Sequence, residues 1–254
     1  MTRRLDFGKV VYGAFLVPWI NRKSFARALA IPLGLMATLT LCSYYLGGHV
    51  PQAFHWLLYV TYWIVFTLFA VTCHRLVLLD SATIGAQWLP RWSRRETRFL
   101  LRFVAVWLIF ALAMWPLLTV LGNLLHRIPG PWQSLPFEEQ WQWAFRVSVV
   151  PAFYIFGRLC VIFPATALDR EVNLRWAWQM TRKNGLRLLF VVGALPWVIA
   201  RLVDVAYRED ATMLEAIALT FLGTALFAVE VSAVSLSYRE LTKGEESTAL
   251  SGTA

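Results

Sequence analysis

Residues 99–122, FLLRFVAVWLIFALAMWPLLTVLG, decide the fold class of this chain because they form a long apolar run interrupted only by Arg102. A membrane core of about 30 Å is crossed by about 20 helical residues. The run lacks the alternating pattern of a barrel strand, and lipid offers no partners for unpaired backbone groups. We therefore expect this segment to be a transmembrane helix.

The composition of the whole chain agrees with a membrane protein. Of its 254 residues, 58% are hydrophobic and 15% are charged. A soluble domain has about 45–50% apolar and about 25% charged residues. This balance excludes a disordered chain and a basic nucleic-acid-binding domain. The three cysteines all fall within apolar runs, which excludes a disulfide scaffold.

Six segments are long and apolar enough to span a membrane, so we expect an all-α, polytopic transmembrane helical bundle. They lie near residues 25–46, 54–78, 99–123, 142–166, 187–207 and 213–238. Residues 1–240 are expected to form a single integral membrane domain. Residues 241–254 are expected to be a short, disordered cytoplasmic tail.

The positions of the basic residues predict the orientation of the bundle. The chain has a formal net charge of +9, and most of its Arg and Lys residues fall at both termini and in the second and fourth connections. The other three connections carry only Arg127 and Arg208. The positive-inside rule then places both termini in the cytoplasm. The basic clusters are expected to contact anionic lipid headgroups, and no nucleic-acid partner is expected.

An aromatic, basic segment precedes each helix that runs outward. These segments are residues 17–27, 89–98 and 178–187. One interpretation is a threefold repeat of an interfacial helix plus a membrane hairpin. The alternative is that any cytoplasmic entry point attracts Trp and Arg. Amphipathic interfacial helices are predicted over residues 5–20 and 170–183, with Asp169 capping the second.

Charged residues inside the predicted spans are candidates for a functional site because each is costly to insert. Arg158 and Glu230 both lie eight residues from the predicted inner ends of their spans, so we expect them to pair at equal depth. The pair has two interpretations: a structural ion pair that fixes helix register, or a polar site for a transported substrate or proton. A second layer of charges is predicted near the outer surface: Arg146, Arg201, Asp204 and Glu215.

Sequence motifs for known chemistry are missing. The chain contains no Walker A loop, dinucleotide glycine fingerprint, HExxH zinc helix or GxSxG elbow. We therefore expect no metal, no cofactor and no enzymatic activity.

One stretch resembles known membrane-protein families. Its pattern comprises Arg158, Pro164-Ala165, Trp178, Thr181 and Gly185. It is similar to the membrane domain attached to some glycerophosphodiester phosphodiesterases and to the YciC-like inner-membrane proteins. The resemblance covers about thirty residues and implies a six-span protein of the bacterial inner membrane. The phosphodiesterase chemistry of fused relatives belongs to a separate soluble domain, which the resemblance does not cover.

These observations lead to two functional hypotheses. The first is a membrane accessory or scaffold protein without catalysis, which predicts a closed bundle with paired charges. The second is a small transporter or lipid-handling protein that uses a polar site around Arg158 and Glu230. The second hypothesis predicts an open cavity lined by these charges.

Overall fold

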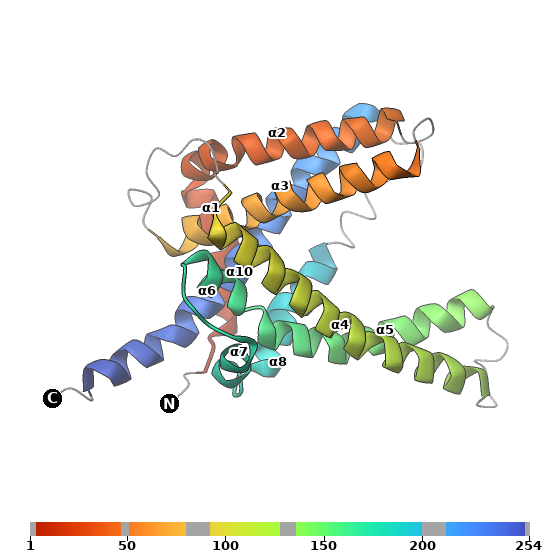
Figure 1. The fold of residues 1–254 in the computed structure, drawn as a ribbon. Helices are drawn as coiled ribbons and strands as arrows, with labels where there is room; N and C mark the ends of the chain where they lie inside the picture. The colour runs from red at the N-terminus through yellow and green to blue at the C-terminus, as the bar shows by residue number, and fades with distance from the viewer. Residues whose placement is uncertain (1–3, 47–50, 80–91, 128–135, 200–211, 252–254) are drawn as a thin grey trace.

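A computed structural model describes residues 4–46, 51–79, 92–127, 136–199 and 212–251 (Figure 1). All regular structure within these ranges is helical, and they contain no strand. The helices are α1 (Phe7–Ile20), α2 (Arg22–Leu46), α3 (Gln52–Leu78), α4 (Arg94–Arg127), α5 (Phe137–Leu159), α6 (Ile162–Ala167), α7 (Leu174–Met180), α8 (Gly185–Leu188), the π-helix η2 (Leu189–Ala194) and α10 (Met213–Ser251).

Five helical segments are long and apolar enough to cross a membrane, which confirms the all-α polytopic class. They are Arg22–Ser43, Gln52–Leu78, Arg94–Leu124, Phe137–Ala167 and Met213–Lys243. The predicted span 187–207 is described only as far as Ile199, as part of the shorter apolar helix Gly185–Ile199. Its remaining residues lie outside the described ranges. The chain is a multi-pass membrane protein.

Two groups of long helices meet at one end of the molecule. Helix α10 packs against α1, α2 and α3, whereas α4 packs mainly against α5 (Figure 1). Short helix α6 contacts both α3 and α4 and so joins the groups. We call this joined end the basic end, because Arg75, Arg95, Arg98 and Arg102 lie there. Beyond it, the α4–α5 hairpin extends away from α2 and α3 (Figure 1).

The apolar faces of the helices divide between a core and a lipid-facing surface. The core includes Phe69, Val106, Ile162 and Leu188, all almost completely buried. On α4, by contrast, Leu112 is 72% exposed. A soluble protein would not leave such an apolar helix uncovered, but lipid is as apolar as the side chain itself.

Capping boxes set the starts of two spans. At α4, the Ser93 backbone N–H donates to Glu96 Oε2 at 2.8 Å, and Ser93 Oγ accepts from the Arg95 N–H. At α10, the Thr212 N–H donates to Glu215 Oε2 at 2.6 Å. These contacts satisfy backbone donors that the first helical turn leaves unpaired.

The span predicted over 142–166 lies within the candidate span Phe137–Ala167, where a turn at Cys160–Val161 separates α5 from α6. One predicted boundary is wrong. The tail predicted to be disordered from residue 241 is helical through Ser251, because α10 continues past the predicted end of its span. Leu241 is 2% exposed and belongs to the core, which gives the extension a packing contact.

Two of the three proposed repeat units contain a helix, a short turn and a second helix. The first is α1, Asn21 and α2, and the third is α7, residues 181–184 and α8. Of the second segment, residues 89–98, positions 92–98 are described, and those from Arg94 onward already belong to α4. The threefold repeat therefore stays a prediction.

Candidate functional site: an apolar groove with a polar mouth

The predicted ion pair between Arg158 and Glu230 is wrong. No ion pair joins these residues, although both lie in the described part of the chain. Arg158 is instead buried at the end of α5, where α7 folds back over it. Its Nη2 donates to the Trp178 carbonyl and its Nε to Thr181 Oγ1 at 3.3 Å. The depth argument did not take account of α7, whose Trp178 carbonyl, with Thr181 just after the helix, accepts from the guanidinium.

The residues of the pattern that resembles the two membrane-protein families lie near Arg158, where α7 and α8 pack against α5. The single Thr181 O–H lies within hydrogen-bonding distance of carbonyls at the ends of α5 and α7, including that of Arg158 at 3.1 Å. A Cβ on Gly185 would lie 2.6 Å from the Tyr154 ring, so α8 approaches α5 closely only because this residue is glycine. Ala165 and Pro164 are buried in α6, and the Ala165 carbonyl accepts from the Arg170 N–H. The residues of this pattern thus stabilise the turn after α6 and the packing of α7 and α8 against the end of α5.

Asp169 does not cap the helix that it was predicted to cap. Asn173, not Asp169, caps α7, and its side chain accepts from the Trp176 N–H at 2.8 Å. Asp169 terminates α6 with φ 61°, and the Arg170 N–H→Ala165 and Asp169 N–H→Thr166 bonds complete a Schellman motif.

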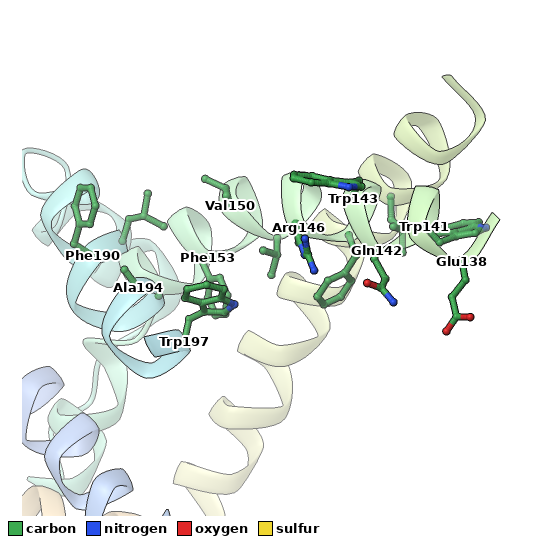
Figure 2. Close-up of a pocket in the computed structure, with 15 residues that line it drawn as sticks. Glu138, Trp141, Gln142, Trp143, Arg146, Val150, Phe153, Phe190, Ala194 and Trp197 are labelled. Atoms are coloured by element: carbon green, nitrogen blue, oxygen red, sulfur yellow. The ribbon is translucent and has the colours of Figure 1, made fainter. Parts of the chain in front are cut away.

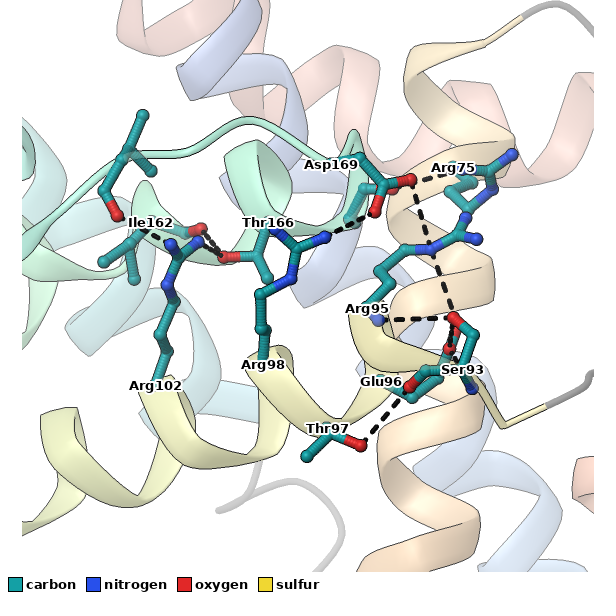
Figure 3. Close-up of polar contacts among 12 residues, drawn as sticks. Arg75, Ser93, Arg95, Glu96, Thr97, Arg98, Arg102, Ile162, Thr166 and Asp169 are labelled. Carbon is teal, nitrogen blue, oxygen red and sulfur yellow. Dashed lines mark hydrogen bonds and ion pairs between the residues drawn. The ribbon is translucent and has the colours of Figure 1, made fainter.

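The Asp169 carboxylate lies among arginines at the basic end. It contacts Arg98 Nη2 at 3.0 Å and Arg95 Nε at 3.5 Å (Figure 3). The Arg75 guanidinium donates to the Ala167 carbonyl at 3.3 Å. This arrangement attaches the α6–α7 loop to α3 and α4.

The predicted outer charge layer is not a single cluster in the described residues. Glu215 caps α10, and Arg201 and Asp204 lie outside the described ranges. Arg146 lies on α5 and is exposed, with its guanidinium carbon 5.1 Å from the centroid of the Trp143 ring. Within the described part of the chain, Arg146 has no ion-pair or hydrogen-bond partner.

Arg146 lines a large open groove, which is the candidate site. The groove has a volume of about 1260 Å³ and lies between α5 and the following apolar helix, with a contribution from α4 (Figure 2). Most of its lining is apolar or aromatic: Leu118, Trp141, Trp143, Phe145, Val149, Val150, Phe153, Leu189, Phe190, Gly193, Ala194 and Trp197.

The groove has polar residues toward one end only. Glu138, Gln142 and Arg146 recur every four residues and so share one face of α5. Farther along the helix, that lining continues with Val150 and Phe153 (Figure 2). From Glu138 to Phe153 the helix rises about 22 Å. The groove therefore changes from a polar mouth to an apolar interior.

The π-helix η2 forms the wall opposite the apolar part of α5. Leu189, Phe190, Gly193 and Ala194 belong to it and line the groove. A Cβ on Gly193 would lie 3.1 Å from Phe153 Cβ, so the two helices meet closely at the groove's inner end. π-helical segments are frequent at functional sites because they displace side chains from regular helical positions.

The sequence analysis included Arg146 but missed the groove. The four-residue spacing of Glu138, Gln142 and Arg146 was an available signal. The contribution of η2 had no such signal, because it depends on how two helices pack.

The described residues contain no group of His, Cys, Asp and Glu side chains suited to hold a metal ion. Comparisons of the chain with protein-family models, curated proteins and solved structures find no match. The resemblance to the two bacterial families stays a prediction.

Proposed function

We propose that this membrane protein handles lipid and binds an amphiphile in the groove between α5 and the helix Gly185–Ile199. The supporting observation is that the lining of the groove changes along its length from polar to apolar side chains. The polar end has Glu138, Gln142 and Arg146, and the apolar end has Phe153 and Phe190. The polar residues would contact a headgroup, and the apolar interior would cover acyl chains. Arg146 supplies a cation for a phosphate or carboxylate.

The groove favours lipid handling over the accessory or scaffold role. A scaffold is expected to have a closed bundle with paired charges, whereas this groove is open and Arg146 has no ionic partner among the described residues. The site also differs from the one expected from the sequence, because neither Arg158 nor Glu230 lines the groove. Membrane accessory function without catalysis stays a prediction.

The predicted orientation of the protein indicates which leaflet of the bilayer the polar end of the groove faces. If the basic end faces the cytoplasm of a bacterial inner membrane, as the positive-inside rule predicts, the polar mouth lies toward the outer leaflet. A lipid could then enter sideways from the bilayer, with its headgroup near the membrane surface.

Native mass spectrometry of protein released from lipid nanodiscs tests this proposal. Ala194→Trp places a bulky ring in the groove and is expected to reduce retained phospholipid at least about fivefold, equivalent to about 1 kcal/mol. Leu112→Trp is the matched control, because Leu112 lies on the exposed surface of α4 outside the groove. Equal lipid retention by both monodisperse variants would overturn the proposal.

Headgroup recognition needs a second pair of variants. Arg146→Gln is expected to weaken retention of phospholipids, whereas Arg127→Gln should leave it unchanged. Arg127 is exposed at the end of α4 and does not line the groove. If Arg127→Gln weakens phospholipid retention equally, Arg146 contributes only to the general surface charge, and specific headgroup recognition by Arg146 is contradicted.

A further inference from the structure

A second, smaller groove lies at the basic end, apart from the site described above. It has a volume of about 450 Å³ and is formed by α4, α6 and the start of α7. Leu101, Ala105, Ile162 and Leu174 make its apolar lining, and Arg102 and Arg175 add positive charge. Leu101 is 64% exposed and belongs to a candidate membrane span, so the groove faces the bilayer.

The guanidinium group of Arg102 is fixed beside this groove by hydrogen bonds to two uncharged acceptors. Its Nη1 donates to Thr166 Oγ1 at 2.5 Å, and its Nη2 donates to the Val172 carbonyl at 2.7 Å. Figure 3 shows Arg102 extending from α4 toward Thr166. Glu171 is near enough to interact electrostatically with Arg102, but no ion pair joins them. The hydrogen bonds fix the guanidinium without neutralising it.

Two other nearby carboxylates, those of Asp169 and Glu96, form ion pairs with arginines outside the groove. Asp169 contacts Arg98 and Arg95, and Glu96 contacts Arg95 and caps α4. Arg175 is exposed and has no ion-pair or hydrogen-bond partner for its side chain within the described ranges. Two arginines thus border an apolar, bilayer-facing groove, and within the described ranges neither forms an ion pair with a carboxylate, Glu171 acting on Arg102 only from beyond ion-pair distance.

We infer that this groove binds an anionic phospholipid, with an acyl chain along Leu101 and Ala105 and the phosphate at Arg175. Charge complementarity selects this occupant: Arg102 and Arg175 are cationic, and the apolar lining can cover a hydrocarbon chain. Asn173 strengthens the assignment. Its side-chain oxygen caps α7, so its amide N–H groups are not used in that bond and can donate to a phosphate oxygen in the groove that Asn173 lines.

The site is independent of the proposed lipid groove near Arg146. The two grooves share no lining residue, and on α4 the second is lined by Leu101, Arg102 and Ala105 whereas the first is lined by Leu118. A variant that empties one is expected to leave the other occupied, so the two proposals can fail separately.

The test compares nanodiscs of phosphatidylcholine with nanodiscs containing phosphatidylglycerol. Native mass spectrometry counts the phosphatidylglycerol molecules that stay bound after release. Arg175→Gln is expected to lower this retention about fivefold relative to Arg182→Gln, since only Arg175 is placed to contact the phosphate of a lipid held in the groove. Arg182 is the matched control: it is exposed on the loop after α7 and does not line the groove.

A groove-filling variant separates site binding from general electrostatic attraction. Ala105→Phe keeps every charge and should displace the acyl chain, whereas Ala111→Phe places the same ring on an exposed part of α4. Loss of retention with Ala105→Phe alone supports the inference. Equal retention in the two phenylalanine variants, or equal effects of Arg175→Gln and Arg182→Gln, would overturn it.

Discussion

The guanidinium carbon of Arg158 lies 3.5 Å from the centroid of the Trp178 ring. The same guanidinium donates to the Trp178 backbone carbonyl, so one residue of α7 supplies both an aromatic face and a hydrogen-bond acceptor. Arg158 is only 5% exposed. A buried cation is therefore accommodated by a ring, a backbone carbonyl and a hydroxyl, and no carboxylate of the described ranges pairs with it.

Arg158→Leu should destabilise the protein, because it removes the cation–π contact and leaves the Trp178 carbonyl without this donor. The expected loss in free energy of unfolding is about 3 kcal/mol. Denaturation followed by tryptophan fluorescence in detergent measures it. Adding Glu230→Leu should not restore stability, whereas an Arg158–Glu230 ion pair would predict recovery. Recovery in the double variant would contradict the observed contacts.

Gly185→Ala should weaken the joint between α5 and α8. Its Cβ would lie 2.6 Å from Tyr154 Cε2, so the ring or the helix must shift, and the expected cost is about 1–3 kcal/mol. The thermal midpoint in detergent is the measurement, and Tyr154→Leu in the same chain should recover part of the loss.

Gly223→Ala is the matched control for that substitution. Apart from the backbone of its own helix, no atom lies within 4 Å of the Cβ position at Gly223, which is in the interior of α10. Alanine should stabilise this helix by up to about 1 kcal/mol through its higher helix propensity. A similar loss from both alanine variants would show that the contact with Tyr154 does not explain the need for Gly185.

Substitutions at Asp169 should separate backbone strain from ion pairing. Asp169→Gly relieves the φ of 61° but removes the contacts with Arg98 and Arg95, whereas Asp169→Ala removes the contacts and keeps the strain. The alanine variant should be less stable than the glycine variant by about 1 kcal/mol. Thermal midpoints of the two variants test this order, and equal midpoints would count against a strained backbone at Asp169.

Cysteine labelling tests the predicted orientation. The native cysteines are first replaced, and single cysteines are placed at 130, 210, 183 and 243. An impermeant thiol reagent added to intact cells should label positions 130 and 210, because the positive-inside rule places the basic connections in the cytoplasm. Positions 183 and 243 should react only after the membrane is permeabilised. Labelling of 183 in intact cells would reverse the orientation.

The number and placement of the long apolar helices followed largely from the sequence. Runs such as residues 99–122 leave few alternatives to a transmembrane helix, because lipid cannot satisfy an unpaired backbone. The structure describes five of the six predicted spans as long apolar helices, and it describes the fifth predicted span only in part. The sequence also identified Arg158, Trp178, Thr181 and Gly185 as a pattern, but not what the pattern builds.

Contacts between distant residues were decided only by tertiary structure. Equal depth and opposite charge suggested that Arg158 would meet Glu230. Instead, α5 ends at Leu159 and α7 folds back over Arg158, so that the guanidinium donates to the Trp178 carbonyl. The lipid groove likewise needs η2 to pack beside α5 so that Phe190 faces the same space as Arg146. Hydropathy along a chain determines which segments enter a membrane. It does not determine which faces meet, because helix packing depends on side-chain shape at close approach and lipid provides no hydrophobic drive between helices.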